Sequence, residues 1–148
     1  MEKYKVLDIA GDIGLRAYGQ TIEEAFINAS IGMYTLTTDP DGVEERSSIE
    51  VALQSNSLER LLVSWLNELI FHFDAYGFVG KRIVFDEFFA SAGLPESLPV
   101  CRLKAVLYGE EFDPERHEGK LLIKAATYHR LNIEQRDDRW EISVVFDI

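Results

Sequence analysis

The chain has 148 residues, of which 47% are hydrophobic, and its 26 acidic and 15 basic side chains give a formal net charge of −11. This length supports a single domain over residues 1–148, with a core that needs neither disulfides nor a structural metal. The negative charge argues against tight RNA or DNA binding by the chain alone, because that affinity comes mainly from Lys and Arg side chains. A basic partner or a bound cation suits it better. A lone Cys101 and the lack of a long uncharged apolar run predict a cytoplasmic protein that does not enter a membrane.

Hydrophobic periodicity predicts several short strands and two long helices. In chain order, the sequence predicts strands over 4–7 and 15–18, a helix over 22–34, a strand over 48–53, a helix over 58–73, and strands over 82–90, 101–108, 120–126, 131–135 and 140–146. Asp113 followed by Pro114 predicts a short helical turn. Many strands with two helices indicate an α+β fold, a mostly antiparallel sheet packed against the helices.

Both predicted helices have a recognisable start. Thr21 and Glu24 form a capping box, in which their side chains satisfy free amides of the first turn. Ser57 caps the second helix. Its apolar stripe consists of Leu58, Leu61, Leu62, Trp65, Leu66, Leu69, Ile70 and Phe73. This stripe predicts that the second helix is the central helix of the core.

The sequence lacks the motifs of the common enzyme classes. It has no Gly-x-Ser-x-Gly, no phosphate-binding glycine loop and no Cys/His pair at zinc spacing. Cys101 lies on the apolar side of a predicted strand, which favours an inert core thiol over a catalytic one. His72 is predicted to face solvent from its helix. His117 and His129 lie near turns, where surface or local hydrogen-bonding roles are commoner than catalysis.

Carboxylates at the two ends of the chain form a more informative pattern. Asp8 and Asp12 flank a turn between two predicted strands, and Asp147 precedes the terminal carboxylate of Ile148. If the last strand pairs beside the first, these oxygens meet at one end of the sheet. Converging carboxylates repel unless a cation neutralises them, and oxygen donors without Cys or His suit Ca²⁺, Mg²⁺ or Mn²⁺. The alternative is that the turn Asp residues bond their own backbone.

An ordered series of short motifs, spread from the first strand to the last residue, resembles the archease family. These motifs are Asp8-Ile-Ala-Gly-Asp-Ile-Gly14, Glu23-Glu-Ala-Phe26, Ala29, Gly32-Met33, Leu61-Leu62, Trp65-Leu-Asn-Glu-Leu69, Gly109-Glu110, Arg116-His117, Lys124-Ala-Ala-Thr-Tyr-His129 and Val145-Phe-Asp-Ile148. Each motif is short, but their order and coverage of the chain make the resemblance specific. One departure lies in the first loop, where the family usually has Asp-His-Thr-Ala-Asp and this chain has Ile9, Ala10 and Gly11 between the two Asp residues.

The resemblance implies a small α+β protein that activates an RtcB-type RNA ligase and is not a ligase itself. It implies that Asp12, Asp147 and Ile148 bind a divalent cation, calcium above manganese or magnesium, and we expect Asp8 close enough to complete the site directly or through water. It also places His117 and Lys124 among the family's recurring polar positions. We expect these two near the metal or on the surface that meets the ligase.

Two other functions remain open from the sequence. The chain could be a small metal-dependent phosphoester hydrolase, in which Asp8, Asp12 and Asp147 hold the metal and His117 or Lys124 assists. It could also be a chaperone-like module that binds through an exposed apolar patch. For the activator, we expect no catalytic activity of its own. We expect recognition through acidic side chains that meet basic groups of the ligase, namely Glu110, Glu111, Asp113 and Glu115.

Overall fold

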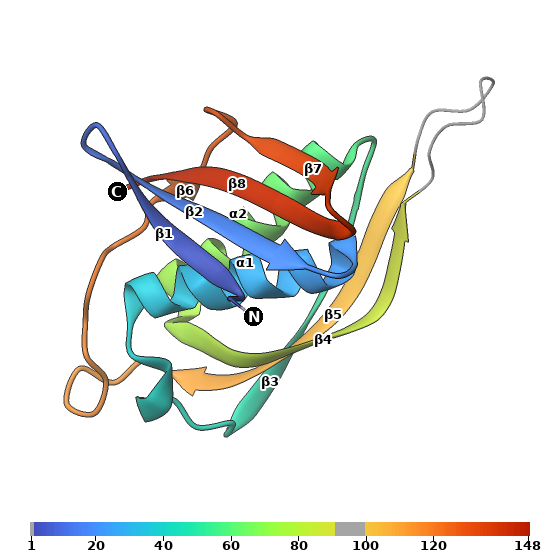
Figure 1. The fold of residues 1–148 in the computed structure, drawn as a ribbon. Helices are drawn as coiled ribbons and strands as arrows, with labels where there is room; N and C mark the ends of the chain where they lie inside the picture. The colour runs from blue at the N-terminus through green and yellow to red at the C-terminus, as the bar shows by residue number, and fades with distance from the viewer. Residues whose placement is uncertain (1, 91–99) are drawn as a thin grey trace.

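In the part of the chain that the computed structural model describes, residues 2–90 and 100–148, two α-helices lie between a five-stranded and a three-stranded β-sheet (Figure 1). The elements are β1 (Tyr4–Ile9), β2 (Asp12–Gly19), α1 (Ile22–Thr37), the 3₁₀ helix η1 (Pro40–Gly42), β3 (Ser47–Ser55), α2 (Leu58–Tyr76), β4 (Phe78–Ala90), β5 (Cys101–Glu111), β6 (Ala125–Ala126), β7 (Asn132–Arg136) and β8 (Arg139–Asp147). This architecture confirms the predicted α+β class.

Every strand pair in the two sheets is antiparallel. The larger sheet has the order β1-β2-β8-β6, and β7 also pairs with β8. The smaller sheet has the order β3-β5-β4. The last strand of the chain is therefore an interior strand of the larger sheet, bonded to β2 on one edge and to β6 and β7 on the other.

The helices start where their caps predict. The Thr21 hydroxyl accepts the Glu24 N–H at 3.1 Å, and the Ser57 hydroxyl accepts the Arg60 N–H at 3.1 Å. Helix α2 ends at Gly77, whose φ of 70° is the left-handed conformation that suits glycine at this position.

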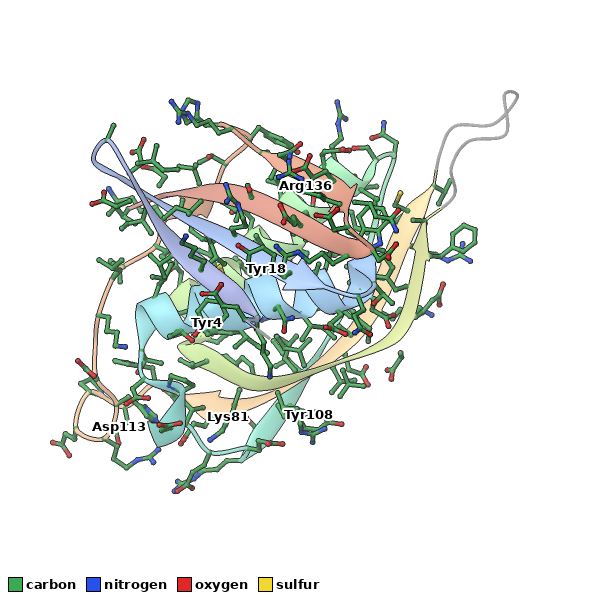
Figure 2. The ribbon with its side chains drawn as sticks, in the orientation of Figure 1. Tyr4, Tyr18, Lys81, Tyr108, Asp113 and Arg136 are labelled. Atoms are coloured by element: carbon green, nitrogen blue, oxygen red, sulfur yellow. The ribbon has the colours of Figure 1, made fainter. Side chains whose placement is uncertain are left out.

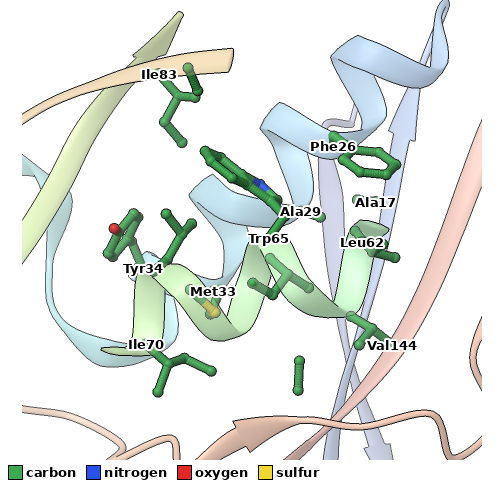
Figure 3. Packing of buried hydrophobic residues seen from close by; sticks show 14 of the residues in the cluster. Ala17, Phe26, Ala29, Met33, Tyr34, Leu62, Trp65, Ile70, Ile83 and Val144 are labelled. Atoms are coloured by element: carbon green, nitrogen blue, oxygen red, sulfur yellow. The ribbon is translucent and has the colours of Figure 1, made fainter. Parts of the chain in front are cut away.

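Trp65 lies at the centre of the core, fully buried between the two sheets (Figure 3). Its indole N–H donates to the Ser30 hydroxyl at 2.6 Å, and Ser30 in turn donates to the Phe26 carbonyl at 2.8 Å. A polar contact thus links α2 to α1 inside an apolar core, where the indole N–H needs a partner. Cys101 is also buried, at 3% exposure, as its strand pattern predicts.

The predicted strand over 120–126 is wrong for most of its length, because only Ala125–Ala126 pairs in the sheet. The N–H groups of Lys120 and Leu121 donate instead to the carbonyls of Thr37 and Leu36, both at 3.0 Å. These two carbonyls belong to the last turn of α1, beyond the point where the helix itself supplies N–H partners. The segment therefore caps a helix before it reaches the sheet.

The helical turn predicted at Pro114 is a single hydrogen-bonded turn. The N–H groups of Arg116 and His117 both donate to the Asp113 carbonyl, at 3.0 and 2.7 Å.

Neither of the two described helices combines the length and apolar character that crossing a bilayer requires.

Candidate functional site

The β1–β2 hairpin sets the position of Asp12. Its two turn residues, Ala10 and Gly11, have φ values of 46° and 93°. A two-residue hairpin turn of type I′ requires positive φ at both of these positions. Glycine adopts this conformation freely, whereas Ala10 accepts strain of about 1 kcal/mol. The turn makes Asp12 the first residue of β2, directly opposite Ile9.

Strand register then brings Asp147 beside Asp12. Ile13 of β2 faces Phe146 of β8, and the two acids follow one position farther out on their respective strands. Both are exposed, and neither has an ion-pair partner among the described residues. Two carboxylates this close on neighbouring strands repel each other, and a cation between them would offset that repulsion.

Hydrogen bonds on the other edge of β8 hold its end in place. The Lys124 N–H donates to the Asp147 carbonyl at 2.7 Å, and β6 follows immediately. Asn67 of α2 bonds both polar groups of Ala126, accepting the N–H at 2.8 Å and donating to the carbonyl at 3.3 Å. The strand is thus fixed as far as Asp147, and Ile148, 42% exposed, follows at the same end.

The sheet places Asp8 differently. Asp8 is opposite Ile13, so alternation along the strands directs its side chain to the face shared with Ile13 and away from that of Asp12. Within residues 2–90 and 100–148, no group of three or more His, Cys, Asp or Glu side chains could hold a metal ion. The end of the sheet therefore offers two Asp carboxylates together with the main-chain oxygen of Ile148. Oxygen donors of this kind fit a hard divalent cation, with water completing the shell.

The sequence-selected basic residues lie in separate places. Lys124 is exposed next to the end of β8, and His129 is exposed in the turn before β7. His72 is half-buried, with its Nε2 3.3 Å from Glu68 on the preceding turn of α2, so it is less solvent-facing than predicted. His117 is separate from Lys124 and the end of β8. It lies in the loop that contains Asp113, which Figures 1 and 2 show well apart from the C-terminus.

His117 belongs to a buried cluster centred on Glu110. Its imidazole is fully buried, and Nδ1 accepts the Asp113 N–H at 2.8 Å. The proton therefore lies on Nε2, which is 3.2 Å from Glu110 Oε2 and donates to it. A local hydrogen-bonding role for His117 is confirmed, and a surface position is not.

Glu110 receives donors from two sides. Its Oε2 accepts the Glu44 N–H at 2.5 Å, and its Oε1 accepts from Arg116 Nη2, with Arg46 Nε 3.7 Å away. The Glu44 N–H lowers the pKa of Glu110 most, Arg116 and His117 lower it further against the opposing effect of burial, and the pKa falls to about 2. Glu110 is 3% exposed, which overturns the expectation that it meets basic groups of a partner.

A cavity of about 480 Å³ adjoins this cluster, lined by residues that include Arg46, Glu111, Asp113 and Arg116. Sequence analysis missed the cluster, because glutamate is rarely buried and its partners lie 66, 7 and 6 positions away. The motifs Gly109-Glu110 and Arg116-His117 contain three residues of the cluster and were the signal in the sequence that could have indicated it.

Replacing Glu110 with Gln is expected to reduce the pH dependence of stability in acid. The depressed pKa of Glu110 means that its ionised form stabilises the fold fully above about pH 4.5, and that this contribution is lost as the pH falls toward 2. In urea unfolding from pH 7 to pH 2, wild type should lose more stability across that window than E110Q. E115Q, which removes an exposed acid of the same loop, should behave as wild type. Equal slopes for wild type and E110Q would contradict the assignment.

Comparison with known proteins identifies relatives across the whole chain. The pattern that defines the Archease protein family (MTH1598/TM1083) matches residues 4–148. The protein archease of Pyrobaculum islandicum is 39% identical, over 98% of this chain and 95% of that one.

Solved structures give the same result for the fold. The solution structure of Methanobacterium thermoautotrophicum protein 1598 superposes with a TM-score of 0.79 at 29% identity and covers 100% of both chains. The crystal structure of an archease from Thermotoga maritima, described as a possible chaperone, gives 0.62 at 21% identity and covers 97% of this chain and 96% of that one.

Proposed function

The chain belongs to the archease family, and we propose that it is a non-catalytic, chaperone-like activator of an RtcB-type RNA ligase. In this proposal it promotes the nucleotide-charging step and multiple turnover of the ligase, in tRNA splicing or RNA repair. The observation that carries the proposal is the pairing of β2 with β8, which sets Asp12 next to Asp147. These are the two acids that the family resemblance selects.

Asp12, Asp147 and the terminal carboxylate or carbonyl of Ile148 are the ligands of a divalent cation in this proposal. Calcium is the first choice, with manganese and magnesium as alternatives, because all the donors are hard oxygens. The Asp8 side chain projects from the opposite face of the sheet. In this proposal it therefore reaches the cation through a bridging water and not as a direct ligand. The bound cation supplies neutralisation of the facing carboxylates and a fixed charge at the surface.

The ligase is recognised through protein contacts. The net charge of −11 opposes RNA binding by the chain alone and favours encounter with a basic partner surface. With Glu110 buried, the acidic side chains left for that contact are Glu111, Asp113 and Glu115. Lys124, exposed beside Asp147, completes the contact surface at the cation site, and His117 supports it indirectly by holding the Asp113 loop.

The test is a ligation assay with the RtcB-type ligase of the same organism. With the ligase limiting, addition of the chain should raise the number of RNA ends joined per ligase molecule many-fold. D12N should remove most of this stimulation, whereas D74N, an exposed acid on α2, should not. The chain alone should neither join RNA nor hydrolyse simple phosphoesters.

Two results would overturn the proposal. One is unchanged ligase turnover in the presence of the folded chain. The other is phosphoesterase activity of the chain alone that D12N removes, which would favour the hydrolase. Binding to the ligase should also weaken as salt rises and persist without RNA, because it depends on charge between proteins.

A further inference from the structure

The face of the larger sheet that points away from the helices carries a row of polar donors. Strand register aligns Lys5, Arg16, Ser143 and Asn132 across β1, β2, β8 and β7 as direct neighbours. Residues at facing positions share one face of a sheet, so these four side chains project together. Arg16 Nε donates to the Ser143 hydroxyl at 3.3 Å, which leaves the hydroxyl proton of Ser143 free to donate.

Three members of this row, Arg16, Ser143 and Asn132, line a pocket of about 260 Å³. Arg130, from the turn before β7, contributes a second guanidinium to the lining, and Leu7, Ile9 and Val145 contribute apolar surface. Gly14 lies between Leu7 and Val145 in the register, and its missing side chain lets Ile9 and Leu7 pack over the strand, since a Cβ at Gly14 would lie 3.1 Å from Ile9 and 3.3 Å from Leu7.

The arginines of this pocket differ from most others in the chain. Of the nine arginines in the sequence, six form ion pairs with Asp or Glu, namely Arg46, Arg82, Arg102, Arg116, Arg136 and Arg139. Arg16, Arg60 and Arg130 form none with the described residues, and two of these three line the same pocket. In a chain with eleven more acids than bases, two arginines without carboxylate partners at one pocket leave positive charge available to a ligand.

The backbone at Arg130 supports the same conclusion. Its φ of 55° is left-handed, and the Leu131 N–H closes the turn by donating to the Tyr128 carbonyl at 3.2 Å. Gly or Asn adopts this conformation more easily than Arg. An arginine held in a strained turn at the edge of a pocket is a feature typical of binding sites.

We propose that this pocket binds the phosphate group of a nucleotide or of an RNA end. Two guanidinium groups, a hydroxyl, an amide and the nearby Lys5 ammonium match the several oxygens and the double charge of a phosphate. A carboxylate has two oxygens and would leave donors unused. The apolar wall of Leu7, Ile9 and Val145 suits the organic part of a phosphate ester.

The pocket is distinct from the proposed cation site on the same face. Arg16 lies four positions after Asp12 in β2, which corresponds to roughly 14 Å at about 3.4 Å per residue. A single phosphate held by two arginines does not give tight RNA binding, because that requires many phosphate contacts. The inference goes beyond the proposed function and does not depend on the ligase.

The experiment is an amide-shift titration of the ¹⁵N-labelled full chain in buffer free of divalent cations. Inorganic phosphate is added and compared with acetate at constant ionic strength. We expect saturable shifts at Gly14, Asn132 and Ser143 with phosphate and at least tenfold weaker binding of acetate. R130N should weaken phosphate binding at least tenfold without lowering the melting temperature, since Asn accepts the left-handed turn. R60Q removes the same charge from an exposed site on α2 and should bind as wild type.

Further arms of the titration separate the two sources of the phosphate. A nucleoside triphosphate is compared with a short RNA that carries a 3′-phosphate and with the same RNA lacking it. If the nucleoside triphosphate binds more tightly than inorganic phosphate, the ligand is a nucleotide. If the RNA with the 3′-phosphate does so, the ligand is an RNA end. Either result supports the pocket. The proposal is overturned by an absence of saturable shifts in the pocket, by acetate binding as tightly as phosphate, or by R60Q losing as much affinity as R130N.

Discussion

Replacing Asp12 or Asp147 with Asn is expected to remove most of the stabilisation that Ca²⁺ gives to this protein. At a Ca²⁺ concentration 100 times Kd, a ligand that binds only the folded state adds about 2.7 kcal/mol to the free energy of unfolding. Without the cation, each variant should be within about 0.5 kcal/mol of wild type, because both side chains are exposed. Loss of the repulsion between them acts in the stabilising direction.

Thermal unfolding with and without Ca²⁺, together with calorimetric titration, measures both effects. D74N, which removes an exposed acid on α2, should keep the full response to Ca²⁺. A response to Ca²⁺ that survives in both D12N and D147N would exclude these residues as ligands.

Gly109→Ala is expected to be among the most destabilising single substitutions in the chain. A methyl group at this position would lie 1.8 Å from the Val79 carbonyl oxygen, where β4 and β5 approach closely beside Glu110. The backbone of the two strands must separate to accept it, and overpacking of this kind costs about 1–3 kcal/mol or more. The Glu110 cluster, which follows directly in β5, should lose order with it.

Gly42→Ala provides the matched control for that substitution. Its new methyl group would meet neighbours at 3.8 Å, an ordinary contact, so we expect a change within about 1 kcal/mol, in the stabilising direction if the unfolded chain loses freedom. Urea unfolding of the two variants measures the difference. Equal stability of G109A and G42A would show that the strands do not approach so closely in solution.

Local sequence signals predicted the helices well, and long-range pairing explains what they missed. Thr21 and Ser57 mark the helix starts because a cap acts within three residues. The sequence suggested a last strand that lies beside the first, whereas β8 pairs with β2. This pairing depends on contacts between residues more than 120 positions apart. Lys120 and Leu121 have the pattern of a strand, and only the position of the last turn of α1 shows that their N–H groups cap a helix.

The candidate sites differ in the same way. Resemblance selected Asp12 and Asp147, and the register sets them side by side, while their binding of a cation stays a prediction. No sequence rule predicts a buried Glu110, because its stability depends on Glu44, Arg116 and His117 arriving together from different segments. The pocket of Arg16 and Arg130 cannot be predicted from the sequence either, since it depends on two distant arginines that form no ion pair with the described residues.

The interior position of β8 has a consequence for how the protein folds. Its buried residues Ile142, Val144 and Phe146 cover the core, and its edges join β2 to β6 and β7. Its partners in β2 lie more than 120 positions earlier in the chain. Pairing between such distant segments is slow, because the entropy of closing the long loop must be lost before the contacts form. The larger sheet therefore closes late in folding, and the acids of the proposed cation site come together at that step.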